Sequence, residues 1–313
     1  EINGGGAASY TDAIKSYSSA SGVVNWKLAD TDSVNFINPG STWVLVYTAT
    51  MDDVAGAGLS FTNDAEILSY FSKPDSDTTE RRSFTNPASD DATVSLPSPT
   101  DLSKTLVTPV GAEVAIGQAV QYEILVPQTP VDAALYDVNV IDDLPEEFVS
   151  IVVTPSVTNS PHTPSVTITD NTTGHDVSVN YSYIPAGEQA RVLVDAVLAN
   201  NTSNNEGDTK SNSATYNWKP SPTGSATTVG PVQADFDIVE PELTVTKALN
   251  GSIQADPSVG FQAGDTAIFR ITVTNPAGGN ATAFDFDIID ESDELLSFVA
   301  IDGASPNLSL IHI

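Results

Sequence analysis

Three side chains of the sequence have the types needed to form an amide bond within the chain: Lys104, Asn212 and an aspartate at position 142 or 195. Burial in an apolar core lowers the pKa of a lysine amine and raises the pKa of a carboxyl group. A neutral Lys104 could then attack the side-chain amide of Asn212 while protonated Asp142 or Asp195 polarises the carbonyl. The alternative is that Lys104 is a solvated lysine on an edge strand and that Asn212 caps a turn.

Such a bond would replace a disulfide in this chain, because the sequence contains no cysteine. The histidines His162, His175 and His312 are too widely spaced for an HExxH-type metal site. Neither a Gly-x-Ser-x-Gly nucleophile turn nor a Gly-x-x-x-x-Gly-Lys phosphate loop is present. We therefore predict that the protein is not an enzyme, apart from this reaction on itself.

The charge of the sequence points to partners other than polyanions. With 41 acidic and 11 basic side chains the formal net charge is -30, which repels nucleic acids. No apolar run reaches the ~18 residues that cross a bilayer, so we expect no membrane insertion of this segment. The first residues do not have the pattern of a signal peptide, and we expect any such signal to lie outside this sequence.

Clustered carboxylates make calcium the one cofactor to consider, although no motif requires a cofactor. Carboxylates two positions apart on a strand share a face, and Ca²⁺ takes oxygen ligands. No stretch has the residue order of an EF-hand loop, so solvated surface charge is the alternative. The candidate ligands are Asp235, Asp237, Glu240, Asp287 and Asp290.

Seven Asn-x-Ser/Thr sequons make the chain a candidate glycoprotein. Most of them fall in expected loops or beside turns, where a glycan would be accessible. In a chain rich in Asn and Thr, chance occurrence is the alternative. The acceptor positions are Asn171, Asn180, Asn200, Asn201, Asn250, Asn280 and Asn307.

The elements that must position these side chains are predicted to be β-strands. Thr, Val, Ser, Asn and Asp dominate the composition, and hydrophobic and polar residues alternate in 120–124, 165–169, 177–183 and much of 190–198. The glycines Gly117, Gly264, Gly187 and Gly40 stand where a turn enters a strand, a place that favours a residue without a β-carbon. About seven such strands make a sandwich, so the predicted fold class is all-β with tandem immunoglobulin-like modules.

Two long stretches of the sequence resemble each other at a nearly constant separation, which indicates tandem copies of one unit. A lysine in an opening strand, a glycine before a strand with an aromatic residue, and an aspartate recur in that order. The separation is 143 positions for Lys104 and Lys247, 147 for Gly117 and Gly264, and 148 for Asp142 and Asp290.

The other part of the unit also recurs. Asn63-Asp-Ala resembles Asn212-Ser-Ala, 149 positions later, and the stretches around Gly40 and Gly187 are similar. We therefore predict three units: residues 1–98 as the later part of a module or a divergent complete one, 99–240 as a complete module, and 241–313 as the first part of a third. Stretches rich in Pro and acidic residues mark both joints.

The order of these motifs resembles a surface-protein repeat of bacteria and archaea, the domain of unknown function eleven. It is also similar to the immunoglobulin-like fimbrial domains that form isopeptide cross-links. The middle unit carries all the parts of the pattern, whereas Glu-Ser-Asp follows Asp290 in place of Asp-Leu-Pro in the third unit. The matching residues of the middle unit are Lys104, Gly117, Tyr122, Asp142, Leu144, Pro145, Asn212 and Ala214.

The resemblance implies a secreted structural protein at the cell surface. The expected function is a repeat subunit of a filament, a pilus-like fibre or an S-layer-like coat, with self-association as the partner and strand exchange between subunits as a mode of assembly. The alternative is the stalk of a surface adhesin whose ligand-binding tip lies outside this sequence.

Overall fold

The structure, a computed structural model, describes residues 14–18, 23–27, 37, 39–40, 42, 44–73, 79–160, 162–170, 174–253, 258, 260–276, 281–293 and 296–297. These residues contain the strands β1 to β16 and no α-helix, which confirms the predicted all-β class. Within the same residues, no helix is long and apolar enough to cross a membrane.

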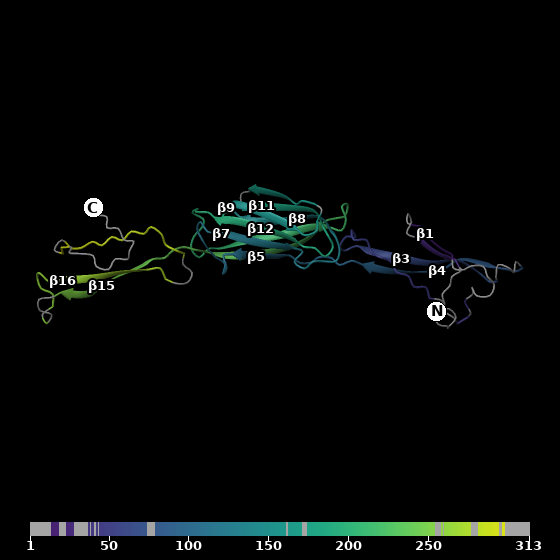
Figure 1. Ribbon diagram of the computed structural model, residues 1–313, viewed down its shortest axis with the longest axis horizontal. Helices are drawn as coiled ribbons and strands as arrows, with labels where there is room; N and C mark the ends of the chain where they lie inside the picture. Colours follow the sequence, from purple (N-terminus) through teal and green to yellow (C-terminus); the bar gives the residue numbers. More distant parts are fainter. Residues whose placement is uncertain are drawn as a thin grey trace.

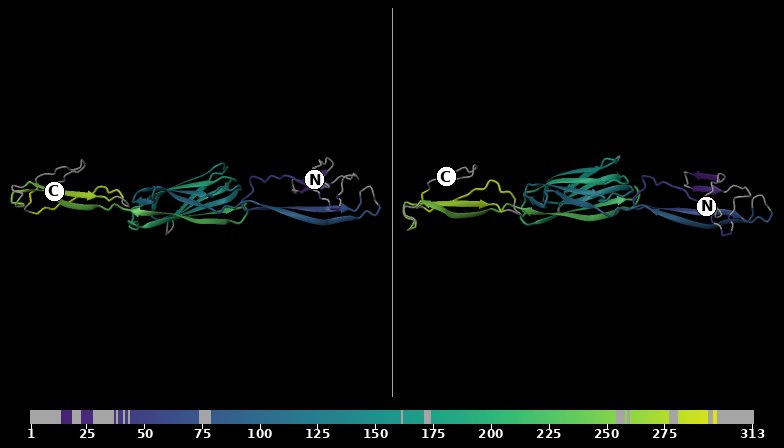
Figure 2. Two further views of the ribbon diagram at one scale, coloured as in Figure 1. Left: turned by 90° about the horizontal axis from the view of Figure 1, so that it is seen from below. Right: turned by 60° about the horizontal axis from the view of Figure 1, so that its bottom comes forward.

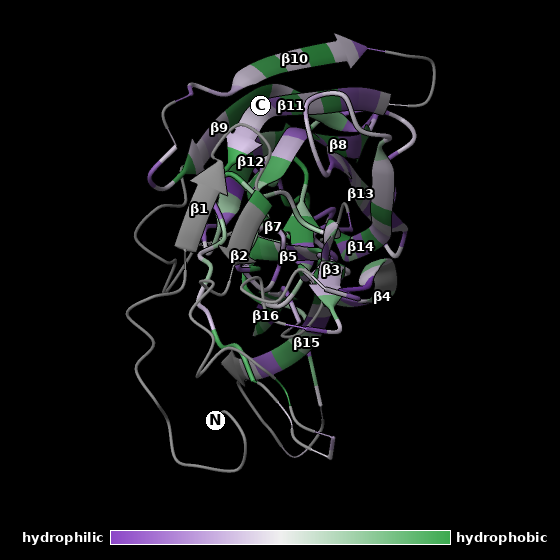
Figure 3. Ribbon diagram, turned by 90° about the vertical axis from the view of Figure 1, so that its right-hand side faces the viewer, coloured by the Kyte–Doolittle hydropathy of each residue, from purple (hydrophilic) through white to green (hydrophobic). Residues whose placement is uncertain are grey.

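The central part of the chain folds into two sheets packed face to face (Figure 1). The strand order is β10-β11-β8-β13-β14-β6 in the larger sheet and β5-β7-β12-β9 in the smaller one. Figure 3 views the molecule end-on, with the larger sheet curving around the smaller. The bounds are β5 Ser103–Thr108, β6 Glu113–Ala115, β7 Ala119–Val126, β8 Leu135–Pro145, β9 Phe148–Val157, β10 Ser165–Asp170, β11 Gly174–Ile184, β12 Ala190–Leu198, β13 Thr209–Lys219 and β14 Thr227–Val239.

Alternation along the strands produces the core of this sandwich. Every second residue of β7 and β12, and of β13 from Asn212 onward, is buried, as expected for strands with one face against a second sheet. Phe148 of β9 and Phe236 of β14 meet across the two sheets with ring centroids 5.3 Å apart. Burial of each large apolar side chain of this kind contributes about 1.5–3 kcal/mol to the stability of the fold.

The predicted turn glycines all adopt left-handed backbone conformations. Gly117 and Gly187 have φ angles of 79° and 76°, and Gly40 and Gly264 have 80° and 96°. A side chain is strained at such angles, so this part of the prediction is confirmed. Gly117 and Gly187 of the middle unit therefore have counterparts with the same backbone conformation in Gly264 and Gly40, in agreement with the predicted repeat.

Two-stranded ribbons lie at opposite ends of the sandwich (Figures 1 and 2). On the N-terminal side, β3 (Ser60–Phe71) pairs with β4 (Ser83–Ser95), and β1 (Ile14–Ser18) pairs with β2 (Val23–Lys27). On the C-terminal side, β15 (Thr244–Ile253) pairs with β16 (Thr266–Thr274). The strands of the sandwich lie within residues 99–240, and the assignment of 1–98 and 241–313 to incomplete modules stays a prediction.

The segment before β3 is anchored in the sandwich core. Ala57 is fully buried there, and its backbone N–H donates to the carbonyl of Ala134 over 2.8 Å. Tyr136 Oη donates to the carbonyl of Val54 over 2.6 Å. Gly56 fits only because it lacks a side chain, since a β-carbon would lie 1.7 Å from the carbonyl oxygen of Pro220. The N-terminal ribbon is therefore joined to the sandwich by packing as well as by the chain.

Candidate cross-link site in the sandwich core

Lys104 lies inside the sandwich although its strand is at the edge of a sheet. It stands opposite Ile124 in the pairing of β5 with β7, with its side chain fully buried. Its Nζ lies 5.1 Å from the centre of the Tyr122 ring, a cation–π distance. Nζ also donates a short hydrogen bond to Asp142 Oδ1. These contacts differ from those of the solvated edge lysine considered as the alternative.

Asp142 reaches Lys104 from the opposite sheet, and Asn212 contacts Asp142 from the neighbouring strand. Asp142 of β8 pairs with Ala214 of β13, and Asn212 lies two residues earlier on the same face of β13. Both side chains are buried, and Asn212 Nδ2 donates to Asp142 Oδ2 over 3.4 Å. Asn212 lies in the middle of a strand and does not cap a turn. The structure thus brings Lys104, Asp142 and Asn212 together between the two sheets.

The surroundings favour the uncharged forms of the pair. Burial lowers the pKa of Lys104, and the charges of Asp142 and Asp143 oppose that effect. Burial raises the pKa of Asp142, against the opposing effects of the Lys104 charge and of the hydrogen bonds from Lys104 and Asn212. An apolar site disfavours charge on either group, which shifts the shared proton toward the carboxylate. A neutral amine beside a protonated acid is the state required for attack on an amide.

Two buried polar atoms beside the pair have no hydrogen-bond partner among the described residues. They are Asn212 Oδ1 and the hydroxyl of Tyr122. An unpaired buried polar group costs about 1–3 kcal/mol, so such atoms need a reason. Tyr122 was identified from the sequence only as part of a motif. The sequence feature that could have pointed to this residue is an aromatic side chain at the same position of both repeats, Tyr122 and Phe269.

Asp195, the other candidate acid, lies elsewhere. It is half-buried on β12, between the buried residues Val194 and Ala196, so its side chain leaves the strand on the face away from the core. Its Oδ1 accepts a hydrogen bond from Gln121 Nε2 over 2.7 Å. Of the two aspartates, Asp142 is the one that contacts Lys104 and Asn212.

The calcium candidates do not gather. Within the described ranges, no group of three or more acidic or histidine side chains is arranged to hold a metal ion. Asp235 and Asp237 lie on the exposed face of β14, and Asp237 Oδ1 accepts a hydrogen bond from Thr209. Asp290 pairs with Lys247. Calcium binding at Asp235, Asp237, Glu240, Asp287 and Asp290 stays a prediction.

Four of the candidate glycosylation sites fall on described residues and are exposed. Asn180 lies on β11 and Asn250 on β15, whereas Asn200 and Asn201 follow β12. Asn201 Oδ1 accepts hydrogen bonds from the backbone and hydroxyl of Ser203. Glycosylation stays a prediction at all of the sites. Asn171, Asn280 and Asn307 lie outside the described residues.

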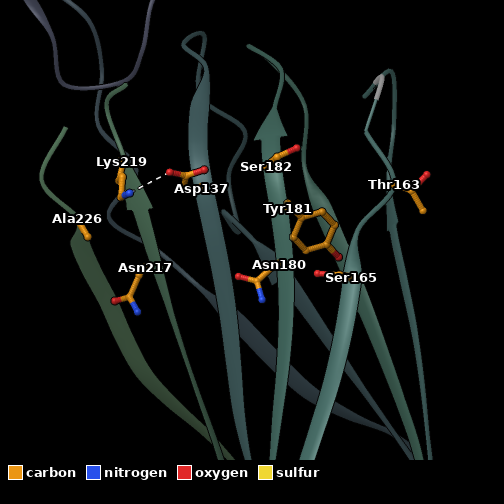
Figure 4. A pocket seen from close by; sticks show the side chains of 9 residues that line it. All are labelled: Asp137, Thr163, Ser165, Asn180, Tyr181, Ser182, Asn217, Lys219 and Ala226. Atoms are coloured by element: carbon orange, nitrogen blue, oxygen red, sulfur yellow. Dashed lines mark hydrogen bonds and ion pairs between the residues drawn. The ribbon is translucent and has the colours of Figure 1, made fainter. Parts of the chain in front are cut away.

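A shallow hollow of about 460 Å³ lies over the larger sheet (Figure 4). Most of the residues that line it have polar side chains, and Lys219 forms an ion pair of 2.9 Å with Asp137 there. Asn180 lies on β11 and Asn217 on β13, the two strands on either side of β8 (Figure 4). The lining residues have none of the pairings that activate a nucleophile, so the buried site between the sheets remains the stronger candidate for chemistry.

No protein-family model and no curated protein matches the chain. Among solved structures it is similar to the major pilin SpaA of Corynebacterium diphtheriae, with a TM-score of 0.33 and 12% identity over 63% of this chain and 65% of that pilin, just under two thirds of its length. The pilus backbone protein RrgB of Streptococcus pneumoniae gives 0.31 and 15% over 57% of this chain and 48% of RrgB. The collagen-binding subdomain of Enterococcus faecalis ACE gives 0.29 and 13% over 44% of this chain and 95% of the subdomain. At these identities the likeness concerns the fold alone. The resemblance to the domain of unknown function eleven stays a prediction.

Proposed function

We propose that the protein is an extracellular structural protein, a repeat subunit of a cell-surface filament or coat, whose middle module is locked by an isopeptide bond between Lys104 and Asn212. The observation that carries the proposal is the buried contact of Lys104 with Asp142, which also contacts Asn212. An ionisable pair in an apolar core is costly unless it has a use. A covalent bond would replace the buried amine and the primary amide of Asn212 by one neutral secondary amide, whose oxygen could accept a hydrogen bond from the protonated acid.

The reaction needs no external reagent. Uncharged Lys104 Nζ adds to Cγ of Asn212, the new C–N bond forms, the bond from Cγ to Nδ2 breaks, and ammonia leaves. Protonated Asp142 donates to the amide oxygen and carries one amine proton to the leaving nitrogen. A half-turn of the Asn212 amide would exchange Nδ2 and Oδ1, so that the unpaired oxygen would face this acid.

The position of the bond suits a load-bearing stalk. It would tie β5, the first strand of the sandwich, to β13 in the opposite sheet and close a loop of about 100 residues. For a cross-link of that loop length, loop-closure entropy gives about 4–5 kcal/mol. The chain enters and leaves the sandwich at opposite ends (Figure 1). Tension applied to the ends would then be carried by a covalent bond, in a chain that has no cysteine for a disulfide.

Intact mass spectrometry of the purified chain tests the proposal. We expect a mass about 17 Da below that of the sequence, the loss of one ammonia, and a branched peptide that joins Lys104 to Asn212 after digestion. The matched control is Lys104→Arg, which keeps a cation at the site and should show no Lys104–Asn212 branch. A folded wild-type chain without this branched peptide would refute the cross-link.

A further inference from the structure

The outer face of the larger sheet carries amide side chains at the centre of the sandwich. Asn139, Asn180 and Asn217 are out of phase with the buried residues of β8, β11 and β13, so their side chains leave the sheet on the side away from the core. Solvated strand faces commonly carry charged side chains, and this chain has 41 acidic residues to place. An uncharged patch at this position therefore suggests a use other than solubility.

These asparagines stand in one row across the sheet. Asn180 is the register partner of Asn139, and Asn139 is that of Asn217. The row continues to Ser165 on β10 and to Thr228 on β14. Because neighbouring strands lie about 4.8 Å apart, a hydrogen-bonding side chain recurs at about this interval along the row. Such a row can follow a chain-like ligand laid across the strands.

Hydrogen bonds within the protein orient two of the amides and leave their donors available. Asn217 Oδ1 accepts from the Thr228 hydroxyl over 2.6 Å, and Asn139 Oδ1 accepts from the Ser178 hydroxyl over 2.7 Å. Within the described ranges, neither Nδ2 donates to a protein acceptor, and the exposed amide of Asn180 has no protein partner. Each amide nitrogen has two N–H donors. The row therefore offers oriented donors to a ligand over the sheet.

The hollow described above gives a ligand room at this row. Its lining includes Ser165, Asn180 and Asn217, three members of the row (Figure 4). The volume of about 460 Å³ is in the range of sites that bind small molecules. The two charged side chains of the lining, Asp137 and Lys219, form an ion pair with each other. The hollow is thus polar without an unmatched charge.

A β-bulge in β8 positions the carboxylate of this ion pair. Between the pairings Asn139–Asn217 and Tyr136–Lys219, β8 has one residue more than β13. Asp137 lies in this interval and has a φ angle of 45°, which few side chains adopt. Bulges redirect side chains and are frequent beside functional sites. Here the bulge accompanies the contact by which Asp137 neutralises Lys219 at the hollow.

An aromatic cluster adjoins the hollow. Thr163 and Ser182 belong to the lining, and their neighbours in the chain, His162 and Tyr183, have ring centroids 6.4 Å apart. The ring of Tyr136 lies 5.3 Å from that of Tyr183 on β8. His162 is exposed and Tyr183 is half-buried. Binding sites for small molecules combine aromatic side chains of this kind with a few polar groups.

We propose that this hollow and the row of amides bind a neutral oligosaccharide. The hydroxyl groups of the saccharide would accept hydrogen bonds from Asn180 and Asn217, and the C–H face of a sugar ring would pack against Tyr183. The ion pair leaves no charge to attract an ion, and the net charge of -30 repels acidic polysaccharides. Saccharide binding is an activity in addition to the structural role and does not depend on the Lys104–Asn212 bond.

Saturation-transfer NMR on the purified chain tests the proposal. The chain is produced in a host without asparagine-linked glycosylation, so that Asn180 stays unmodified. The probes are neutral hexasaccharides of glucose, of mannose and of N-acetylglucosamine, and a sulfated hexasaccharide serves as the charged comparison. We expect saturation transfer to at least one neutral probe and none to the sulfated one.

Variants of the row locate the binding. Asn180→Ala and Asn217→Ala each remove a donor group and should weaken binding of the neutral probe by about two- to tenfold. The matched control is Thr169→Ala, which changes the same outer face outside the hollow and should bind as the wild type does. Thermal unfolding verifies that each variant is folded, and the exposed position of Asn180 makes its substitution the safer one.

Three results would overturn the saccharide site. The first is the absence of saturation transfer to every neutral probe. The second is equal binding by the wild type and both asparagine variants, which would place the saccharide elsewhere on the chain. The third is a preference for the sulfated probe, which would contradict a site without unmatched charge.

Discussion

The chain holds the same arrangement of a lysine, an aspartate and an aromatic ring in two states. Around Lys104 it is enclosed between two sheets, and around Lys247 it stands on an open ribbon. The local register and contacts are alike, and the exposure to water differs. The sequence motif and the local strand pairing therefore bring the lysine, the aspartate and the aromatic ring together. Desolvation by the second sheet and by strand β13 supplies the conditions for reaction, and it is found only around Lys104.

The largest effect is expected when the enclosed site loses its acid. Asp142→Ala leaves the amine of Lys104 buried without its partner, and breaking a buried pair in this way costs about 3–5 kcal/mol. The bond to Asn212 should also fail to form. Urea unfolding and intact mass spectrometry measure both results. Asp143→Ala changes the exposed neighbour and serves as the control. An unchanged mass deficit in Asp142→Ala would contradict the role of this acid.

The pH dependence of stability distinguishes an aspartate that is enclosed in the core from one that is exposed to water. In Lys104→Met, Asp142 stays buried without a cation, and burial raises its pKa above the unfolded value. A group with a raised pKa stabilises the fold below its unfolded pKa, and that stability is lost as the pH rises through the folded pKa. We therefore expect a higher urea midpoint at about pH 4 than at about pH 8. A urea midpoint of Lys104→Met that rises with pH, as in Asp142→Ala, would exclude a raised pKa of Asp142 in this variant.

A smaller effect is expected when the enclosed site is given the aromatic residue of the open one. Tyr122→Phe removes a buried hydroxyl without a partner among the described residues and copies Phe269. Because the hydroxyl is unpaired, its loss should be neutral or stabilising by about 1 kcal/mol, and the cross-link should still form. Thermal unfolding and mass measure the two results. Loss of the bond in this variant would give the hydroxyl a part in the reaction.

The smallest effect is expected at the aspartate that faces away from the core. Asp195→Ala removes one hydrogen bond with Gln121 on the outer face of the smaller sheet. Changes at such positions stay within about 0.5 kcal/mol, and the bond between Lys104 and Asn212 should form as in the wild type. The pair of variants Asp142→Ala and Asp195→Ala, compared in one mass experiment, distinguishes the two candidate acids directly.

Much of the site follows from alternation along the strands. Val138, Val140 and Leu144 define the core face of β8, and Asp142 is in phase with them. Asp195 is out of phase with Val194 and its apolar neighbours, so the same signal was available to reject it. The strand class and the turn glycines followed from similarly local patterns.

Features that depend on the second sheet could not be predicted in this way. The contact of Lys104 with the Tyr122 ring joins neighbouring strands, but the enclosure of both depends on how two sheets pack. The parallel pairing of β6 with β14 joins segments more than one hundred residues apart. The exposure of Lys247 could not be predicted for the same reason. The residues next to it in the sequence resemble those next to Lys104, and the residues that surround it in space differ.

The packing of Ala57 into the sandwich core sets the mechanical character of the joint ahead of that module. A linker that only tethers two bodies lets them swivel, whereas a segment seated between strands transmits torque from one body to the next. A string of modules joined in this way would behave as a stiff rod with a long bending length. At Gly56 the chain passes against Pro220 with no room for a methyl group. Substitution of this glycine by alanine would displace the segment from the sandwich and make the joint flexible.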